Sequence, residues 1–405
     1  MCVPALEKDT SLASSISSSI IKKILTDSLK FKGLIFTDAL NMKGVADFHK
    51  PTELNYLAYK AGNDFLTCPE KIKESIDFIE QQVACGNLTV DEVNSKCRKI
   101  LMAKYTVDLS DYKPIEFKNL QSDLNNSASE LLKRKVIEKG ITLLKGNDLL
   151  PLKRLDSLKI AYVEVGKGKG QNFLSQLEMY SAITSFSLNS ESSLNAYDSI
   201  LTSLDAYNLI IVGCHSIDTR ASKNYGISPQ LSNFIFDLSF RKKVIVDIFG
   251  NPYSLNRLMN IPSLDGLIIS FDNSNISQSL SAQMIFGGIG VKGKLPVSAT
   301  NSIPYGSGYL NTEQIRLKYS IPEELGINPH DLTGADSIAF DAIAKQITPG
   351  MQILAAKDGI VFYNKSFGSF TYSNEVPVTS KSIYDIASVT KVTATLPSIM
   401  HLFDS

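Results

Sequence analysis

Asp38 is the first residue in the sequence whose type and place could support chemistry. It lies just past the apolar run Gly33-Leu34-Ile35-Phe36, which predicts a buried strand of a parallel sheet. In a β/α barrel, side chains at that end of a strand converge on the substrate. A carboxylate there can attack an anomeric carbon and form a glycosyl-enzyme intermediate. The alternative is an Asp that only caps the next turn or helix, which is the commoner role on spacing alone.

A second candidate is the pair Ser388 and Lys391, which would share one face of a helix. A lysine one turn from a serine, if partly desolvated, can activate the hydroxyl as a nucleophile. The spacing alone is a weak signal, because three other pairs repeat it: Ser19 with Lys22, Ser110 with Lys113, and Ser239 with Lys242. Only the pair at 388 is followed by an apolar, helix-like run and preceded by Tyr384-Asp385-Ile386-Ala387.

The run Gly166-Lys167-Gly168-Lys169-Gly170 is a third candidate, because it follows a predicted strand as a phosphate-binding loop would. Its spacing is neither GxGxxG nor GxxxxGK[ST]. We therefore expect a mobile surface loop instead of a nucleotide site.

Composition narrows the class of protein. A chain of 405 residues with 43% apolar and 20% charged residues predicts two or three globular domains. Lys+Arg and Asp+Glu are both 41, so the charge gives no reason to expect nucleic acid as a partner. The five cysteines, at positions 2, 68, 85, 97 and 214, form no CxxC pair, and the four histidines show no HxxxH spacing. We expect buried free thiols, no metal site and no organic cofactor.

The N-terminus shows no charged segment ahead of an apolar one, so no signal peptide is recognised. No run of 18 apolar residues predicts a transmembrane helix. The location of the protein stays open, and a periplasmic or secreted address would need a signal upstream of residue 1.

The elements that must position these residues alternate between strand and helix, which indicates β/α units. The first region has expected helices at 9–30, 53–60, 69–85 and 89–105 around strands at 33–36 and 64–68. A polar connection at 108–127 follows. The middle region has a helix at 128–139 and strands at 159–165, 208–213, 243–248 and 265–270, whose continuous apolar runs predict a covered, mostly parallel sheet. The last region has a helix at 331–346 and a β-hairpin around Asp358-Gly359.

The segment from Phe31 to Val45 resembles the nucleophile segment of family 3 glycoside hydrolases. It is most similar to the β-N-acetylhexosaminidase branch, whose pattern is Ser/Thr-Asp-x-Leu-x-Met followed by Gly, and Ala61 to Leu66 resembles the Ala-Gly-x-Asp-x-Leu motif of that family. By this resemblance Asp38 is the nucleophile and Asp64 is structural. The Asp-His pair that serves as acid/base in this branch, and the sugar-binding residues, would lie upstream. His49 does not fit that motif.

Two further resemblances cover the rest of the chain. Residues 128–300 are similar to the C-terminal α/β sandwich domain of the family, most specifically from Phe286 to Ser298. Residues 331–405 resemble the start of a β-lactamase-related serine hydrolase domain, in which Ser388 would be the nucleophile and Lys391 its base. The tyrosine motif and the Lys-Thr-Gly strand that complete such a site would lie beyond Ser405.

The combined prediction is an α/β chain of three parts, truncated at both ends. Residues 1–107 would be the C-terminal portion of a (β/α)8 barrel, 128–300 the α/β sandwich and 330–405 the N-terminal portion of a β-lactamase-like α+β domain. The expected activity of the parent is retaining hydrolysis of terminal β-linked N-acetylglucosamine, with muropeptides as one substrate, and the chain alone should show little of it. The alternatives are a serine esterase or peptidase-like hydrolase, and a non-catalytic fragment.

Overall fold

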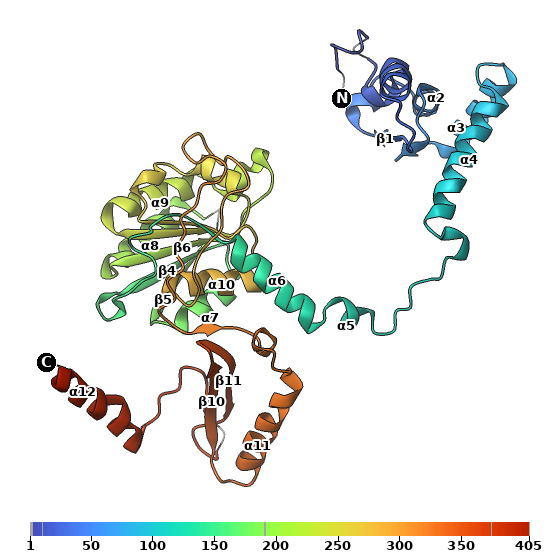
Figure 1. The fold of residues 1–405 in the computed structure, drawn as a ribbon. Coiled ribbons are helices and arrows are strands. Elements are labelled where there is room, and N and C mark those ends of the chain that lie inside the picture. Colours follow the sequence, from blue (N-terminus) through green and yellow to red (C-terminus); the bar gives the residue numbers. More distant parts are fainter. Residues whose placement is uncertain (1–2, 10, 190–191, 374, 405) are drawn as a thin grey trace. The chain divides into compact units, whose positions relative to one another are not determined.

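The structure is a computed structural model that describes residues 3–9, 11–189, 192–373 and 375–404. The chain divides into two compact units, an N-terminal unit of residues 1–118 and a C-terminal unit of residues 119–405. The division falls inside the polar stretch 108–127 that the sequence marks as a connection. Figure 1 traces both units in sequence order.

The N-terminal unit is built on two parallel strands, β1 (Phe36–Ala39) and β2 (Phe65–Thr67), connected through helix α2 (Pro51–Ala61). Pro51 opens α2, and Gly62, at φ 119°, ends it in the left-handed conformation that glycine favours. The remaining elements are helical: a 3₁₀ turn at Ser14–Ile16, a π-helical segment at Ser19–Ser28, α1 (Lys43–Ala46), α3 (Ile72–Ala84), α4 (Val90–Thr106) and a 3₁₀ turn at Leu109–Asp111.

Two expected boundaries in this unit are wrong. The helix expected over 9–30 starts only at residue 14 and is broken between 16 and 19. The strand expected over 33–36 begins at Phe36 and continues to Ala39. Apolar character sets the expected strand end, whereas pairing with β2 sets the real one. By contrast, α4 starts as predicted at Thr89, whose side chain and that of Glu92 form a capping box.

The core of the N-terminal unit is small. One cluster contains Ala13, Ile16, Leu40, Val45, Leu54 and Ala58, and α4 contributes no buried residue. Cys68, Cys85 and Cys97 are exposed, so the expectation of buried thiols is wrong for these three and holds for Cys214, while Cys2 lies outside the described residues. These thiols are exposed because few residues pack over the strands and helices of this unit.

The C-terminal unit is organised around a six-stranded mixed sheet in the order β3-β8-β7-β6-β4-β5. Five strands are parallel and the edge strand β3 is antiparallel to β8. The strands are β3 (Thr142–Lys145), β4 (Ile160–Val165), β5 (Ile183–Leu188), β6 (Leu209–Cys214), β7 (Lys243–Ile248) and β8 (Gly266–Ile269). The four predicted strands are confirmed to within a residue at each end.

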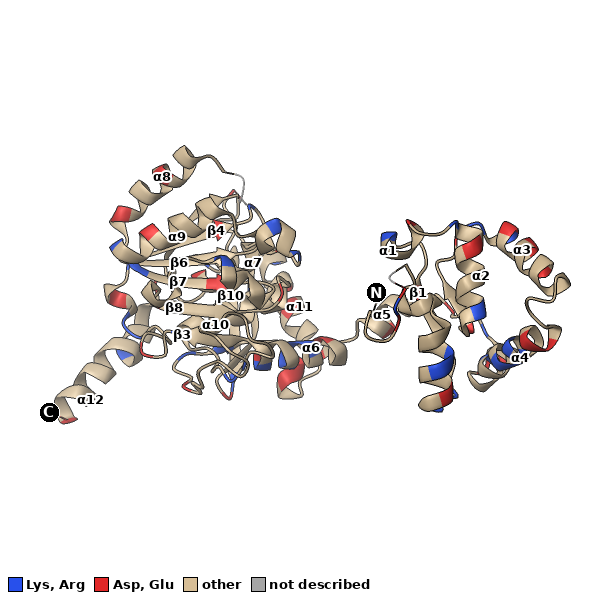
Figure 2. Cartoon of the chain, turned by 90° about the horizontal axis from the view of Figure 1, so that it is seen from above, with Lys and Arg blue, Asp and Glu red and all other residues tan. Residues whose placement is uncertain are grey.

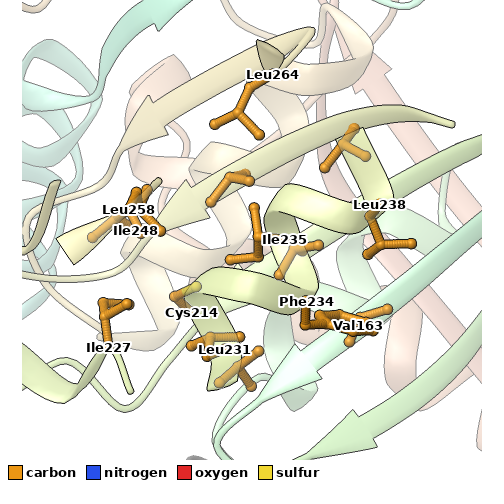
Figure 3. Packing of buried hydrophobic residues seen from close by; sticks show 14 of the residues in the cluster. Val163, Cys214, Ile227, Leu231, Phe234, Ile235, Leu238, Ile248, Leu258 and Leu264 are labelled. Carbon is orange, nitrogen blue, oxygen red and sulfur yellow. The ribbon is translucent and has the colours of Figure 1, made fainter. Parts of the chain in front are cut away.

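Helices cover both faces of this sheet, which explains why its strands are apolar throughout. On one face, α8 (Leu194–Ser203) and α9 (Pro229–Arg241) pack on the cluster drawn in Figure 3, where Leu231 and Ile235 lie near Cys214. On the other face, α6 (Ser127–Gly140), α7 (Gln171–Glu178) and α10 (Asn275–Phe286) close a second cluster. The short helix α5 (Leu120–Leu124) precedes α6.

The last part of the unit is a hairpin of β10 (Gly350–Lys357) and β11 (Ile360–Gly368), as predicted. Asp358 and Gly359 have φ values of 52° and 77°, as two-residue hairpin turns require. Helix α11 (Thr333–Ala344) packs on one face of the hairpin through Ala339, and β9 (Lys318–Tyr319) adds a parallel strand beside β11. The chain ends in a π-helical turn at Lys391–Thr395 and α12 (Leu396–Asp404).

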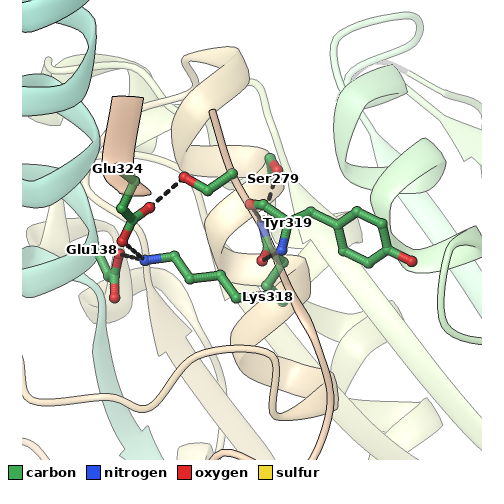
Figure 4. A network of polar contacts seen from close by, with 7 residues as sticks. Glu138, Ser279, Lys318, Tyr319 and Glu324 are labelled. Atoms are coloured by element: carbon green, nitrogen blue, oxygen red, sulfur yellow. Dashed lines mark hydrogen bonds and ion pairs between the residues drawn. The ribbon is translucent and has the colours of Figure 1, made fainter. Parts of the chain in front are cut away.

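Strand β9 also ties the hairpin to the six-stranded sheet. Lys318 is 7% exposed, and its Nζ lies 2.6 Å from both Glu138 Oε2 and Glu324 Oε1 (Figure 4). The main chain of Tyr319 both donates to and accepts from the side-chain amide of Gln283, at 2.8 and 3.0 Å. Backbone and ionic contacts together therefore fix the hairpin within this unit.

Acidic and basic residues are interspersed along the helices of each unit, as Figure 2 shows. Among the described residues, no helix is both long and apolar enough to cross a membrane.

Candidate active site

Asp38 lies within β1 and its side chain is exposed. Its backbone N–H donates to Ser15 Oγ at 3.3 Å, and the N–H of Ala39 donates to Asp38 Oδ1 at 2.8 Å. Only one carboxylate oxygen therefore makes a hydrogen bond within the described protein. The other is free for a reacting group, as a nucleophile requires. The side chain of Asp38 caps no described helix, and its bond to Ala39 N–H lies just before the turn at 40–41, so of the capping alternative only the turn remains.

A reciprocal pair of threonines holds the backbone of Asp38 in place. Thr67 N donates to Thr37 Oγ1 and Thr67 Oγ1 donates to Thr37 O, both at 2.8 Å. Leu40 N then donates to Thr67 O at 3.0 Å. These bonds bracket Asp38 on both sides in the chain, so its direction is set by the β1–β2 pairing and not by a flexible loop.

Phe36 and Asp38 lie on the same face of β1, because alternate residues of a strand point to the same side. Phe36 stacks on Phe65 of β2 with ring centroids 4.6 Å apart and is 58% exposed. This face of β1 therefore carries an aromatic ring, that of Phe36, and two residues later the carboxylate of Asp38.

Asp64 has a different environment from Asp38, in line with the structural role expected for it. It is 8% exposed, and its Oδ2 accepts hydrogen bonds from Ile35 N at 2.8 Å and from Lys99 Nζ at 2.6 Å. A carboxylate already paired with a cation and a backbone amide fastens β1 to α4. His49 makes no hydrogen bond to Asp38, and its Nε2 is buried without a partner in the described protein.

The structure brings the second predicted pair together. Lys391 Nζ donates to Ser388 Oγ at 3.0 Å, across the 3₁₀ turn Ala387–Val389 and the start of the π-helical turn. Both side chains are exposed. The contact places the amine beside the hydroxyl, with the amine as donor, and no described residue besides Lys391 hydrogen-bonds to Ser388 Oγ.

The glycine-rich loop is held by several hydrogen bonds. Gly170 N donates to Glu164 Oε1 at 2.7 Å, while Lys169 O accepts from the side-chain amides of Gln278 at 2.8 Å and Asn273 at 3.3 Å. Asn273 in turn contacts the ring of His215. The loop is therefore anchored on the side facing the sheet, although Lys167 and Lys169 are exposed.

His215 is a structurally important residue that the sequence pattern did not single out. It is 3% exposed, with Nε2 2.7 Å from Tyr162 Oη and Nδ1 2.7 Å from Asn273 Oδ1. Burial lowers the pKa of His215 to about 4, so the ring is neutral at pH 7. A histidine directly after the apolar run of β6 was the available signal.

Comparison with known proteins addresses the region that carries Asp38. Residues 1–103 match the family model "Glycosyl hydrolase family 3 N terminal domain". This region is similar to glycoside hydrolase family 3. The chain is 26% identical over 148 residues to beta-hexosaminidase A of Pseudoalteromonas piscicida, covering 34% of this chain and 24% of the relative. It is 30% identical over 100 residues to a beta-hexosaminidase of Vibrio cholerae, covering 25% of this chain and 28% of that protein.

Solved structures resemble a larger share of the chain. A family 3 beta-N-acetylglucosaminidase from Paenibacillus sp. aligns with a TM-score of 0.57 and 21% identity over 73% of this chain and 57% of that one. Beta-glucoside phosphorylase BglX aligns with a TM-score of 0.59 and 19% identity over 73% and 55%. At such identities the likeness supports the α/β fold with its mixed sheet. The chain spans about a quarter of the curated relatives and just over half of these structures.

Proposed function

We propose that Asp38 is the nucleophile of a retaining glycoside hydrolase that releases terminal β-linked N-acetylglucosamine, including that of muropeptides. The observation that carries the proposal is the exposed, backbone-fixed Asp38 inside the region that matches the family 3 model. The beta-hexosaminidase names of the relatives support the N-acetylglucosaminide class. In the reaction, Asp38 attacks the anomeric carbon while the C–O bond to the leaving group breaks and that group departs. Water then attacks the anomeric carbon of the glycosyl-enzyme ester, which releases N-acetylglucosamine and the free Asp38 carboxylate.

The proposal includes the arrangement of the parts. Residues 1–107 contribute strands of a β/α barrel, residues 128–300 are the α/β sandwich that follows it, and residues 330–405 begin a β-lactamase-like domain. The face of β1 that carries Phe36 and Asp38 would point to the barrel axis, and the C-terminal end of the strand, with Asp38, would face the mouth where a saccharide ring is bound. The exposed Phe36–Phe65 stack supports this orientation, since barrel interiors are filled by such side chains.

The test uses an activated leaving group that departs without a proton donor, so that the rate depends on the nucleophile alone. We expect the chain to hydrolyse 2,4-dinitrophenyl β-N-acetylglucosaminide slowly and a 4-methylphenyl analogue far more slowly. Asp38→Asn should lower the dinitrophenyl rate by about 10³-fold or more, as loss of a nucleophile does. Asp47→Asn, at an exposed neighbouring acid, is the control and should keep the rate.

An Asp38→Asn variant with the wild-type rate on the dinitrophenyl substrate would contradict the role of Asp38. A first product of inverted configuration, seen by proton NMR, would contradict the retaining mechanism.

The Ser388–Lys391 contact favours a second candidate function, acyl transfer by the last part of the chain. In this reaction Lys391 would accept the proton of Ser388 as Oγ attacks an ester or amide carbonyl. The amine would then give that proton to the alcohol or amine that leaves when the acyl–O or acyl–N bond breaks. Acylation of the protein by a penicillin-type probe, lost in Ser388→Ala and kept in Ser398→Ala, would support it. Absence of any acyl adduct would exclude it for this chain. The remaining alternative, a non-catalytic chain, is excluded by either activity.

A further inference from the structure

The hairpin carries α11 on one face only, and its other face lines a hollow of about 550 Å³. Gln352 and Leu354 of β10 and Asn364 of β11 form the floor, and α7 of the six-stranded sheet region forms the opposite wall. Because β9 is tied to Gln283 and Glu138 at the same time, the two walls are held in a fixed relation. The size lies in the range of small-molecule sites.

Several polar side chains in the lining of this hollow have unused hydrogen-bonding capacity. The Ser175, Ser380 and Tyr319 hydroxyls and the Asn364 side-chain amide line it, and none of them makes a hydrogen bond to the described protein. The set offers both donors and acceptors. A ligand rich in hydroxyl groups, each of which donates and accepts, matches such a lining better than a ligand with acceptors alone.

Charge in the hollow is balanced by its own residues. Lys381 Nζ lies 2.7 Å from Glu178 Oε1, and the Glu178 side chain is 20% exposed. The pair leaves no net charge that would select an anion or a cation. The remaining lone pairs of the carboxylate and hydrogens of the ammonium can still bond to hydroxyl groups of a neutral ligand.

Apolar surface is also present. Leu354 is 54% exposed, and Met179 and Tyr319 belong to the same lining. In Figure 4 the Tyr319 ring points away from Lys318, and its backbone is fixed by Gln283 on both the N–H and the C=O. Exposed apolar groups among polar ones match the C–H faces of a sugar ring. Because the backbone of Tyr319 is already held in place, less conformational entropy is lost when its aromatic ring contacts a ligand.

We propose that this hollow binds a neutral saccharide of one or two rings, at a site separate from Asp38. The Asn364 amide and the Ser175, Ser380 and Tyr319 hydroxyls bond to the sugar hydroxyls, while the Gln352 side-chain amide is held by Thr379 O. The Glu178–Lys381 pair closes one side, and Leu354 and Tyr319 contact the ring faces. The proposal does not rest on glycosidase activity, because it concerns binding alone and none of its residues belongs to the N-terminal unit.

Saturation-transfer difference NMR on the full chain tests it, with N,N′-diacetylchitobiose, cellobiose and glycylglycine as probes. We expect at least one disaccharide to bind with a Kd below about 10 mM and to weaken about tenfold or more in Leu354→Trp, which fills the hollow from an exposed position. Asn364→Ala should weaken binding several-fold, consistent with loss of a hydrogen bond. Lys357→Ala, on the same strand but outside the lining, and Asp38→Ala should both bind like the wild type.

Three results would overturn the proposal. They are no saturation transfer to either disaccharide, wild-type affinity in both Leu354→Trp and Asn364→Ala, and tighter binding of glycylglycine than of the disaccharides. If binding were lost in Asp38→Ala alone, the saccharide would be bound at the proposed active site and not in this hollow, and the proposal would again be overturned. Far-UV circular dichroism of each variant separates loss of binding from loss of fold.

Discussion

Asp247 provides a quantitative test of the packing in the C-terminal unit. It lies in β7 with no exposed surface, and within the described part of the chain its carboxyl group accepts hydrogen bonds from two hydroxyls alone, Ser270 Oγ at 2.8 Å and Ser281 Oγ. Burial raises the pKa of Asp247 to about 7, although both hydrogen bonds act in the opposite direction. A rise from 3.8 to about 7 corresponds to about 4 kcal/mol of folding free energy.

The sign follows from the raised pKa. Between pH 4 and 7 the folded protein keeps the Asp247 proton while the unfolded chain has released it, so this group's contribution falls as the pH rises. The stabilising contribution of the Asp247 proton is fully present below pH 4 and is lost above pH 7. His215 acts in the opposite direction, because its pKa is lowered to about 4 and stability rises with pH up to 6.5. The wild-type profile is therefore partly flattened, and only a difference between variants isolates Asp247.

Asp247→Asn keeps a polar group of the same shape that does not ionise. We expect its unfolding free energy, relative to the wild type, to rise by about 4 kcal/mol between pH 4 and pH 8. Asp237→Asn, at an exposed carboxylate on α9, should show a difference that is nearly independent of pH.

The assay uses Cys214, which is buried in the same unit. With the other cysteines replaced by serine, a short pulse of 4,4′-dithiodipyridine, which reacts with thiols at pH 4 as well as at pH 8, labels Cys214 only in unfolded molecules after equilibration in urea. The midpoint and slope of labelling against urea give the unfolding free energy of this unit. A wild-type-minus-Asn difference that changes by less than about 1 kcal/mol between pH 4 and 8 would refute the described environment of Asp247.

Two further substitutions test other parts of the same unit. Gly170→Ala should destabilise this unit by about 1–3 kcal/mol, because a Cβ at residue 170 would lie 2.2 Å from Tyr162 Oη and 2.6 Å from His215 Nε2. The Cys214 labelling assay measures this loss. An unfolding free energy equal to that of the wild type would show that the loop shifts freely. Lys318→Met should lower the free energy of unfolding by about 3 kcal/mol, because two carboxylates lose their shared cation. Limited proteolysis of residues 321–329 should be faster in this variant. An unchanged cleavage rate would show that β9 stays in place without the ion pairs.

The elements whose own residues determine their structure were predictable from the sequence. The capping box of α4, the Asp358-Gly359 turn and the strands of the covered sheet each combine a local preference with a matching hydrophobic pattern. Strand β5 gave no such signal, because it is a polar edge strand with a single buried residue, Leu188. Its pairing with β4 decides its structure, and pairing partners are not visible in a single segment.

In the candidate site, too, features set by neighbouring residues were predictable and features set by distant residues were not. The motif around Asp38 indicated the residue, but its place inside β1 depends on the Thr37–Thr67 bonds, which join residues 30 positions apart. The Ser388–Lys391 contact follows from local helical spacing and was predictable. His215 was not, because its partners Tyr162 and Asn273 are more than 50 residues away in the chain. The exposed cysteines were missed because the sequence does not show which faces stay uncovered.

The most direct measurement of the central claim is covalent trapping at Asp38. A 5-fluoro-N-acetylglucosaminyl donor with a dinitrophenol leaving group needs no proton donor and forms an ester that hydrolyses slowly. After incubation and proteolysis, mass spectrometry should find the added glycosyl mass on the peptide that contains Asp38, and Asp38→Asn should remove it while Asp47→Asn keeps it. A label on any other carboxylate, or no label at concentrations that saturate a family 3 N-acetylglucosaminidase, would contradict Asp38 as the nucleophile.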